Sequence, residues 1–436
     1  MSVRQYPAYK PSGIEWVGDV PSGWAVKPLK RGARLQTVRA EARSFPVALD
    51  NIESWTGRFL ETDAEFEGDG VAFQAGDLLF GKLRPYLAKA WRADRDGEAV
   101  GDFHVIRPGA EILPDYLLRL LLCREIISLI DGSTFGAKMP RASWEFVGSL
   151  PIPYPSLSEQ RAIAAFLDRE TAKIDALIAE QERLIALLQE KRQAVISQAV
   201  IKGLDPTVPM KDSGVEWLGQ VPAHWDIVPV SRRYDVQLGR MLNESRAEGP
   251  DLRPYLRVFD VQWRNINVVD LPMMDFPEDA RARYRLQPGD LLVNEGGSYV
   301  GRSAIWRADI EECYYQKALH RLRAIDKKSD TAEFFLYVME FATRSGVFVA
   351  GGNQTTIDHL TAEQLRRYRF AFPPHVEQVQ IVSALDHQMS RLGALEKESV
   401  DAILLLRERR TALISAAVTG KIDVREAVRA EPAEAA

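Results

Sequence analysis

The chain has 436 residues, of which 46% are hydrophobic and 27% are charged, an ordinary composition for a globular protein. Its length exceeds what one ordinary hydrophobic core needs, so we expect two or three domains. No apolar run approaches the roughly 18 residues that span a bilayer, and residues 1–13 lack the apolar core of a signal peptide, so we expect a cytoplasmic protein. The formal net charge of −5 does not by itself indicate nucleic-acid binding, because a local basic patch is what binds phosphate.

The sequence lacks the motifs of unaided catalysis. Cys123 and Cys313 lie far apart with no cysteine or histidine cluster beside them, which argues against a disulfide framework or structural zinc and predicts two inert thiols. Gly420-Lys421 lacks the first glycine and the hydroxyl residue of a phosphate-binding loop. No Asn-Pro-Pro-Tyr-like string of an amino-methyltransferase occurs, and the six histidines show no metal-ligand spacing. We therefore expect a chain that is not an enzyme and that binds no cofactor or metal itself.

Several segments of the sequence occur twice. Ser12–Gly18 returns as Ser213–Gly219, and each copy is followed by a proline and a tryptophan. Gln74–Leu79 returns as Gln287–Leu292. Around these anchors, short alternating runs predict strands, and each copy has one apolar helix candidate, at 114–130 and 332–348. The chain is therefore a duplicated frame that carries two divergent segments.

Tryptophans recur within the duplicated motifs at Trp16, Trp24, Trp217 and Trp225. Tryptophan is enriched in interface hot spots, so these residues are candidate partner anchors. We favour the interpretation that they pin each motif to its own core.

A long heptad pattern organises the chain. From Ile163, apolar or long-stemmed residues recur at alternating steps of four and three, and an offset of 218 brings the pattern onto a second copy that starts at Ile381. This predicts two long helices that pack along a narrow seam. The polar slots Gln181 and Ser399 are expected to fix the register. The expected apolar seam positions are Ile163, Leu167, Ile174, Leu177, Leu184, Leu188, Val195, Ile381, Leu385, Leu392, Leu395, Ala402, Leu406 and Leu413.

Two similar helices in one chain are able to bury their seams against each other as an antiparallel pair. We hypothesise a register in which facing residue numbers sum to 579 or 580, so that Leu177 faces Ala402, with a shift of one heptad as the alternative. Prolines precede each helix, and Ser156 with Glu159 has the spacing of a capping box.

Together these patterns predict an α+β fold. Two globules, each a mixed sheet with helices, are separated by two long helices that form an antiparallel coiled coil with an internal pseudo-twofold repeat. The expected boundaries are a first globule at 1–155, a long helix at 156–201, a linker at 202–212, a second globule at 213–374, a second long helix at 375–421 and a disordered tail at 422–436.

The duplicated motifs resemble those of a known family over almost the whole chain. G-x-E-W-[LV]-G, the string GDLLFGKLRPYLAK at 76–89, and a proline-rich turn before Glu-Gln-x-x-Ile at each helix start are similar to the specificity (HsdS) subunit of type I restriction–modification enzymes. The resemblance implies that each globule is a target recognition domain for one half of a split double-stranded DNA sequence. It also implies that the helices dock two methyltransferase subunits, which bind S-adenosylmethionine, and through them restriction subunits, which use ATP and Mg.

The candidate DNA contacts of the first copy are cations and one aromatic ring beside an expected strand and turn. Lysine and arginine neutralise phosphates and give affinity and register. A solvated basic loop is the alternative. The candidates are Lys82, Arg84, Tyr86, Lys89, Lys138 and Arg141.

The second copy departs from this pattern. Residues 293–300 read VNEGGSYV where residues 80–87 read FGKLRPYL, so the position carries over but the basic side chains do not. A polar loop at 351–356 has amides and hydroxyls that suit major-groove readout, although a plain connecting loop is equally compatible with the sequence. The candidates are Arg240, Asn294, Tyr299, Arg302, Asn353, Gln354, Thr355 and Thr356.

Two other classes remain open on sequence alone. A coiled-coil scaffold that binds only proteins would also explain the duplicated globules and helices. A stand-alone DNA-modifying enzyme is disfavoured by the missing catalytic motifs.

Overall fold

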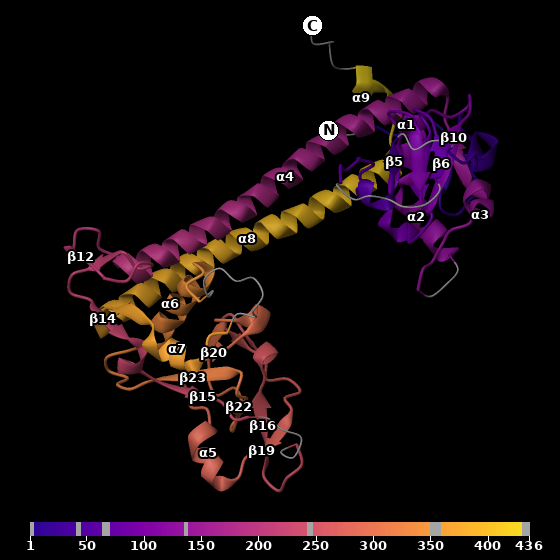
Figure 1. The fold of residues 1–436 in the computed structure, drawn as a ribbon. Helices are drawn as coiled ribbons and strands as arrows, with labels where there is room; N and C mark the ends of the chain where they lie inside the picture. Colours follow the sequence, from indigo (N-terminus) through magenta and orange to yellow (C-terminus); the bar gives the residue numbers. More distant parts are fainter. Residues whose placement is uncertain are drawn as a thin grey trace. The chain divides into compact units, whose positions relative to one another are not determined.

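The computed structural model describes residues 4–40, 45–62, 70–134, 138–241, 247–348 and 359–429 (Figure 1). The chain divides into two compact units: the first comprises Met1–Arg183 and Ser399–Ala436, and the second comprises Leu184–Glu398. Each unit is α+β and includes a stretch of both long helices, α4 (Leu157–Lys202) and α8 (His375–Val418). None of the helices in the described ranges is long and apolar enough to cross a membrane.

The first unit is built on a four-stranded antiparallel sheet. Its strand order is β4 (Ala33–Gln36), β10 (Phe103–Pro108), β7 (Leu78–Gly81) and β8 (Ala90–Arg92). A second sheet has the order β5 (Pro46–Val47), β9 (Gly97–Val100) and β6 (Gly70–Phe73). Two strand pairs join β1 (Tyr9–Pro11) to β2 (Asp19–Pro21) and β3 (Ala25–Pro28) to β11 (Pro151–Tyr154). The helices of this globule are α1 (Pro114–Leu121), α2 (Arg124–Gly132) and α3 (Trp144–Ser149).

The second unit repeats this frame. Its four-stranded sheet has the order β15 (Tyr234–Leu238), β23 (Leu319–Ala324), β20 (Leu291–Asn294) and β21 (Ser303–Ile305). Strand pairs join β12 (Met210–Asp212) to β13 (Gln220–Pro222) and β14 (Asp226–Pro229) to β24 (Arg369–Phe372). Its helices are α6 (Ala332–Arg344) and α7 (Ala362–Arg367), together with α5 (Glu278–Tyr284).

The two units differ most in the segment before the third strand of the large sheet. In the second unit this segment, between β15 and β20, forms β16 (Leu252–Leu256), β19 (Met273–Asp275) and a small pair, β17 (Val261–Gln262) and β18 (Asn265–Ile266). β16 pairs with β19 on one side and, on the other, with β22 (Tyr314–Tyr315), which follows β21 in the chain. Because strand order is preserved while the inserted strands are not, the predicted duplication with divergent segments is confirmed.

The helix candidate at 114–130 is two helices. Leu122 ends α1, and α2 starts after Cys123, whereas its counterpart α6 is continuous. Cys123 and Cys313 are free and buried, and burial raises the pKa of each thiol to about 12. Both cysteines are therefore protonated thiols at neutral pH.

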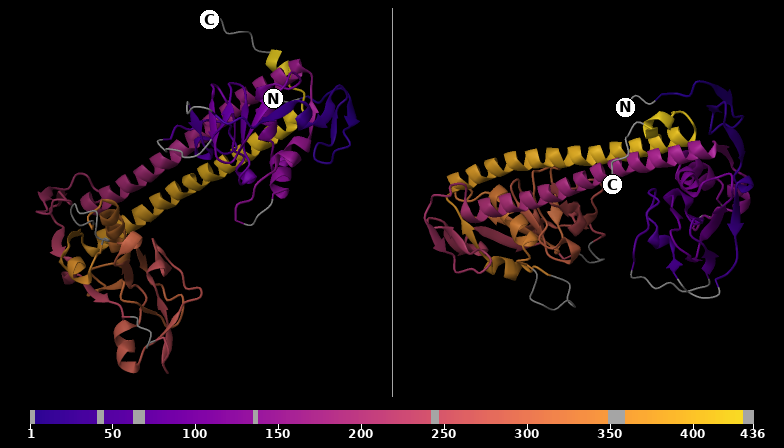
Figure 2. Two further views of the ribbon diagram at one scale, coloured as in Figure 1. Left: turned by 45° about the vertical axis from the view of Figure 1, so that its right-hand side comes forward. Right: turned by 90° about the horizontal axis from the view of Figure 1, so that it is seen from above.

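The long helices run antiparallel within each unit, where a stretch of α4 lies beside a stretch of α8 (Figure 1 and Figure 2). A reciprocal capping box starts α4: the Glu159 N–H donates to the Ser156 hydroxyl at 3.3 Å, and the Ser156 N–H donates to the Glu159 carboxylate at 3.3 Å. In the first unit, the α8 residues Ile414, Ala417 and Val418 belong to the same buried core as Ile163 and Leu167 of α4.

The predicted seam residues are wrong at every second position of the pattern. Leu177, Leu184 and Leu395 are 45%, 40% and 47% exposed. The less exposed residues keep the four-three spacing but lie one position later, at Ile178, Ile185, Arg192, Met389, Glu396, Ile403 and Arg410. The pattern was ambiguous because adjacent apolar residues occupy 177–178, 184–185 and 402–403. Of the other expected positions, Ile163, Leu167, Ile174, Leu188, Ile381, Leu385 and Leu392 are buried, and Val195, Ala402, Leu406 and Leu413 are half-buried.

Of the two registers considered, the one with sums of 579 or 580 is wrong, and the alternative shifted by one heptad is favoured. Side-chain pairs across the two helices join Asp175 to Arg410 and Glu182 to Arg407 in the first unit, and Gln189 to Glu396 in the second. The residue numbers of these pairs sum to between 585 and 589, so the register differs from the predicted one by about one heptad.

The predicted disordered tail starts too early. Val424 is fully buried in the core of the first unit, and the Asp423 N–H donates to the Arg4 carbonyl at 2.7 Å. A short helix, α9 (Arg425–Arg429), follows. Composition alone did not reveal these contacts because they join the two ends of the chain.

Candidate nucleic-acid interface

A tryptophan fixes the start of each long helix to the globule of its own unit. The Trp24 indole N–H donates to Glu159 at 3.2 Å, and the Trp225 indole N–H donates to Glu377 at 3.1 Å. Both tryptophans are fully buried. The geometry favours the interpretation that these residues pin the repeated motif to its own core. The other two repeated tryptophans, Trp16 and Trp217, are half-buried against the same cores.

The glutamine of each Glu-Gln-x-x-Ile motif is buried and hydrogen-bonds two separate backbone segments, and we name this arrangement the glutamine staple. Gln160 accepts from the Leu113 N–H at 2.8 Å, and its side-chain N–H groups donate to the carbonyls of Glu111 and Pro155 at 2.9 and 3.0 Å. It thereby joins the segment before α1 to the turn before α4. Gln378, 218 residues later, occupies the same place in the second unit.

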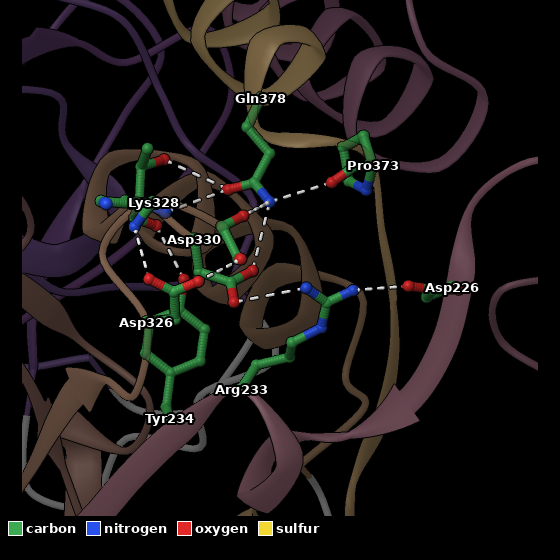
Figure 3. Close-up of polar contacts among 10 residues, drawn as sticks. Asp226, Arg233, Tyr234, Asp326, Lys328, Asp330, Pro373 and Gln378 are labelled. Atoms are coloured by element: carbon green, nitrogen blue, oxygen red, sulfur yellow. Dashed lines mark hydrogen bonds and ion pairs between the residues drawn. The ribbon is translucent and has the colours of Figure 1, made fainter.

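Figure 3 shows the glutamine staple of the second unit. Gln378 accepts from the Thr331 N–H at 3.0 Å and donates to the carbonyl of Pro373 at 3.0 Å and to the carboxylate of Asp330 at 3.2 Å. Burial raises the pKa of Asp330, while Gln378 and the Arg233 guanidinium, 3.4 Å away, act in the opposite direction. The motif therefore has a structural role: it orients the globule on its helix.

The loop after β7 presents an arginine and a tyrosine to solvent. Arg84 is exposed, and its side chain makes no hydrogen bond or ion pair with the described part of the chain. Its backbone is left-handed, with φ 51° and ψ 62°, and its N–H donates to the Pro140 carbonyl at 2.9 Å. Tyr86, within the 3-10 turn Pro85–Leu87, is 46% exposed. This loop is therefore held in place by its backbone, and its side chains remain available.

Two further cations share one carboxylate beside this loop. Arg141 donates to both oxygens of Asp102, at 3.0 and 2.9 Å, and the Lys82 amine lies 3.7 Å from the same carboxylate. Lys138 is exposed and has no partner in the described ranges. These five residues have a net charge of +3, because one carboxylate offsets one of four cations: Lys82, Arg84, Lys138 and Arg141 against Asp102. The structure thus brings four of the five predicted basic residues of the first copy, all except Lys89, onto one loop pair.

Two candidates are placed differently. Lys89 is half-buried and donates to the Leu49 carbonyl at 2.7 Å. Asn294 is fully buried and donates to the Val261 carbonyl at 2.9 Å. The prediction that Asn294 contacts a base is corrected, because a fully buried side chain cannot reach a ligand at the surface.

The other candidates of the second unit pack against aromatic rings. The Arg302 guanidinium lies 4.7 Å from the Tyr299 ring centroid and donates to Gln262 at 2.5 Å. The Arg240 guanidinium lies 5.2 Å from the Phe276 ring centroid. The polar loop candidates lie outside the described residues: Asn353, Gln354, Thr355 and Thr356.

The loops after β7 and β20 share one backbone path. Arg84 and Gly297 are left-handed, with φ 51° and 68°, and each carbonyl accepts from the N–H three residues later. Ala88 and Gly301 are also left-handed, with φ 47° and 75°. A left-handed conformation suits glycine and is costly for other L residues. The alignment of 80–87 with 293–300 therefore holds in three dimensions.

Charge differs between the equivalent positions. Glu295 stands where the first unit has Lys82, because their carbonyls accept equivalent backbone hydrogen bonds, from the Leu360 N–H and the Ala142 N–H. His359 stands where the first unit has Arg141, because each forms the isolated strand contact with the next residue of the loop, Gly296 or Leu83. Burial raises the pKa of Glu295, whereas His359 and Lys317 act to lower it. The same backbone therefore carries a basic face in one unit and an acidic group in the other.

The sequence analysis missed a pair of buried histidines. The His104 Nε2–H donates to the Ala142 carbonyl at 3.0 Å, and the His320 Nε2–H donates to the Leu360 carbonyl at 2.6 Å. Burial lowers the pKa of both rings, that of His320 to about 4. His104 lies on β10, which pairs with β7, and His320 lies on β23, which pairs with β20. Each hydrogen bond therefore holds the segment at Ala142 or Leu360 against the sheet. The sequence signal that could have revealed these residues is the occurrence of a histidine at the equivalent position of both copies.

Fold and site together define a duplicated frame with two different surface loops. The sequence matches the family described as the type I restriction modification DNA specificity domain at residues 95–186 and 275–404, about half of the chain. The chain therefore belongs to this family.

Similar proteins are themselves specificity subunits. The chain is 22% identical over 330 residues to the type I restriction enzyme EcoKI specificity subunit of Escherichia coli strain K12, covering 73% of this chain and 68% of that protein. It is 22% identical over 332 residues to the StySPI specificity subunit of Salmonella potsdam, covering 73% and 67%. A match to the Escherichia coli EcoDI specificity subunit, 24% identical, spans 41% of this chain and only 42% of that protein.

Solved structures share the fold. A chain from a study of complex assembly and conformational transition of the type I R-M system aligns with a TM-score of 0.73 and 20% identity, covering 92% of this chain and 98% of that one. The HsdS subunit from Thermoanaerobacter tengcongensis aligns with a TM-score of 0.56 and 19% identity, again covering 92% and 98%. The predicted α+β architecture and the family resemblance are confirmed.

Proposed function

We propose that this chain is the DNA sequence-specificity subunit of a type I restriction–modification complex and binds a bipartite double-stranded target with one recognition domain per half-site. The observation that carries the proposal is the shared loop path with different charges at equivalent positions. One frame with two different surface chemistries suits the reading of two different half-sites, because base edges are distinguished by the donors and acceptors presented to them.

The basic loop of the first unit supports DNA contact. Lys82, Arg84, Lys138 and Arg141, with the exposed Tyr86, form a positive surface on a chain whose net charge is negative. Local cations of this kind bind phosphates and account for salt-dependent affinity. In the second unit Tyr299, Arg302 and Arg240, and the loop at 353–356, remain the proposed contacts.

Each unit also has a cavity against a long helix, which supports docking of two methyltransferase subunits. The cavity of the first unit measures about 1250 Å³ and that of the second about 330 Å³. Their helix-borne linings are equivalent at an offset of 218: Glu408, Thr411, Ala412 and Ser415 of α8, and Glu190, Gln193, Ala194 and Ser197 of α4. Equivalent linings suit two copies of one partner, since identical subunits present the same surface.

Exposed leucines lie along the same helices. Leu177, Leu184 and Leu187 on α4 and Leu395, Leu404 and Leu405 on α8 are each at least 40% exposed. Apolar side chains repeated along a helix suit burial against a partner helix. We infer that methyltransferase subunits cover them, that S-adenosylmethionine binds those subunits, and that restriction subunits with ATP and Mg join through them in the cytoplasm. This chain is then non-catalytic.

The test is co-expression with the methyltransferase subunit that we expect to be encoded beside this chain, followed by copurification and base-resolution mapping of methylation. A complex that methylates a bipartite motif with a fixed spacer is the expected result. A stable complex without methylation would favour a protein-only scaffold, and cleavage or methyl transfer by the purified chain alone would favour an enzyme. Leu404→Glu should weaken copurification, while Val269→Glu, at an exposed valine outside the long helices, should not.

A further inference from the structure

We propose that Arg84 is a phosphate anchor of the first recognition domain and that the second domain lacks this anchor because its equivalent residue is Gly297. The inference rests on the proposed function as a DNA-binding subunit. It assigns a role to one side chain and an asymmetry to the two half-sites.

The charges around Arg84 leave its guanidinium without an ionic partner in the described ranges. Arg141 is bidentate on Asp102 and Lys82 shares that carboxylate, whereas Arg84 and Lys138 have no ionic partner in the described ranges. An exposed, uncompensated guanidinium beside other cations gains most from a phosphate, whose negative charge is present at every step of the duplex. Arg84 is therefore the cation most available to such a ligand on this loop.

The backbone at Arg84 adopts a conformation that is unfavourable for an arginine. The Arg84 backbone is left-handed, and the equivalent residue of the second unit, Gly297, is also left-handed with φ 68°. The same backbone is thus compatible with glycine, and the arginine side chain is retained at a conformational cost. Strain of this kind points to function when the surroundings hold it in place. Here the Arg84 N–H donates to Pro140, and the Arg84 carbonyl accepts from the Leu87 N–H at 3.0 Å.

These contacts also preorganise the side chain. The main chain on both sides of Arg84 is hydrogen-bonded, so the guanidinium is projected from a fixed base. In the second unit, Glu295 and Gly297 replace Lys82 and Arg84, so this loop brings no cation to the same place. Phosphate contacts there must come from other residues of that unit.

The experiment compares Arg84→Gly with the natural chain in the full complex with methyltransferase subunits. Binding is measured to a target duplex and to an unrelated duplex of equal length between 50 and 200 mM salt. Loss of one phosphate contact should reduce the salt slope by about 0.9, so that the natural complex loses about 3.5-fold more affinity across this range than the variant. The reduction should be equal for both duplexes, because phosphates carry no sequence information.

A matched control separates charge from backbone strain. Ala88→Gly relieves a left-handed residue of the same loop without changing its charge, as in the equivalent Gly301. We expect both glycine variants to keep or raise the urea midpoint of unfolding, and only Arg84→Gly to change the salt slope. An unchanged slope in Arg84→Gly, or an equal change in Ala88→Gly, overturns the proposal.

Two further outcomes are informative. If Arg84→Gly weakens binding to the target duplex alone, Arg84 reads a base and the phosphate role is wrong. Gly297→Arg should steepen the slope by about 0.9, since no atom lies within 4 Å of an added Cβ, and an unchanged slope would refute the asymmetry. If the natural complex binds no DNA, the proposed function fails instead, so the two failures are distinguishable.

Discussion

Replacement of His320 by glutamine should make the second unit less sensitive to acid. The His320 Nε2–H donates to the Leu360 carbonyl, and its Nδ1 is buried with no hydrogen-bond partner among the residues that the structure describes. Protonation of Nδ1 would place an unsatisfied charged donor in the core, and burial lowers the ring pKa to about 4. Glutamine keeps an N–H donor for Leu360 but does not titrate in this range.

The magnitude follows from proton linkage. An unfolded histidine has a pKa of about 6.5. Between about pH 6.5 and pH 4 the unfolded chain binds more protons than the folded chain, so the contribution of His320 is full above this window and is lost as the pH falls through it. With these two pKa values, the free energy of unfolding falls by about 2 kcal/mol from pH 7 to pH 5 because of this ring.

Hydrogen exchange of β20 and β23 amides in the full chain, corrected for intrinsic rates, measures this loss at both pH values. The His320→Gln variant should lose about 2 kcal/mol less than the natural chain over this pH range. His104→Gln, which alters the equivalent ring, should leave the second unit unchanged. Equal pH dependence of the natural chain and His320→Gln would refute the reasoning.

Three other predictions follow from buried contacts and the helix register. Gln378→Leu should destabilise the second unit by about 3 kcal/mol in urea unfolding because it leaves several buried polar groups unpaired, whereas Gln160→Leu should act on the first. Glu340→Gln should lower the free energy of unfolding by about 3 kcal/mol in the same assay, since the fully buried carboxylate forms ion pairs with Arg264 at 3.0 Å and Arg192 at 3.6 Å. An unchanged free energy of unfolding would show that Glu340 is not a paired charge. Cysteines replacing Gln189 and Glu396 should be joined by a short bismaleimide, because these side chains are hydrogen-bonded across the helices at 2.8 Å. Cysteines at 177 and 402 should not be joined, because their numbers sum to 579 whereas the observed pairs sum to 585–589.

The long helices were predictable because their pattern is local. The first long helix was expected at 156–201 and is observed at Leu157–Lys202. Both ends are marked in the sequence, because prolines and a capping serine precede the helix and Gly203 follows it. The phase of the seam was not predictable. Leu177 and Ile178 are both apolar neighbours, and the choice between them depends on the partner helix.

The site was predictable in position but not in detail. The aligned strings at 80–87 and 293–300 located both loops, since a shared sequence context implies a shared backbone. Asn294 was misjudged because its burial depends on Val261, far away in the chain. Asp102 was missed because its pairing with Arg141 joins two loops that sequence spacing does not connect.

One frame tolerates opposite charges at equivalent loop positions because its fixing contacts do not depend on the loop side chains. The residues that fix the loops act mainly through main-chain groups: His104 and His320 donate to carbonyls, and Gln160 and Gln378 bond backbone N–H and C=O groups. Main-chain partners persist whatever side chain stands at each position. The side chains of the exposed loop are therefore largely free of the fold, so Lys82 can be replaced by Glu295 without loss of the loop path. Specificity can then diverge without a new scaffold, because the stability of the frame and the chemistry of the surface are carried by different residues.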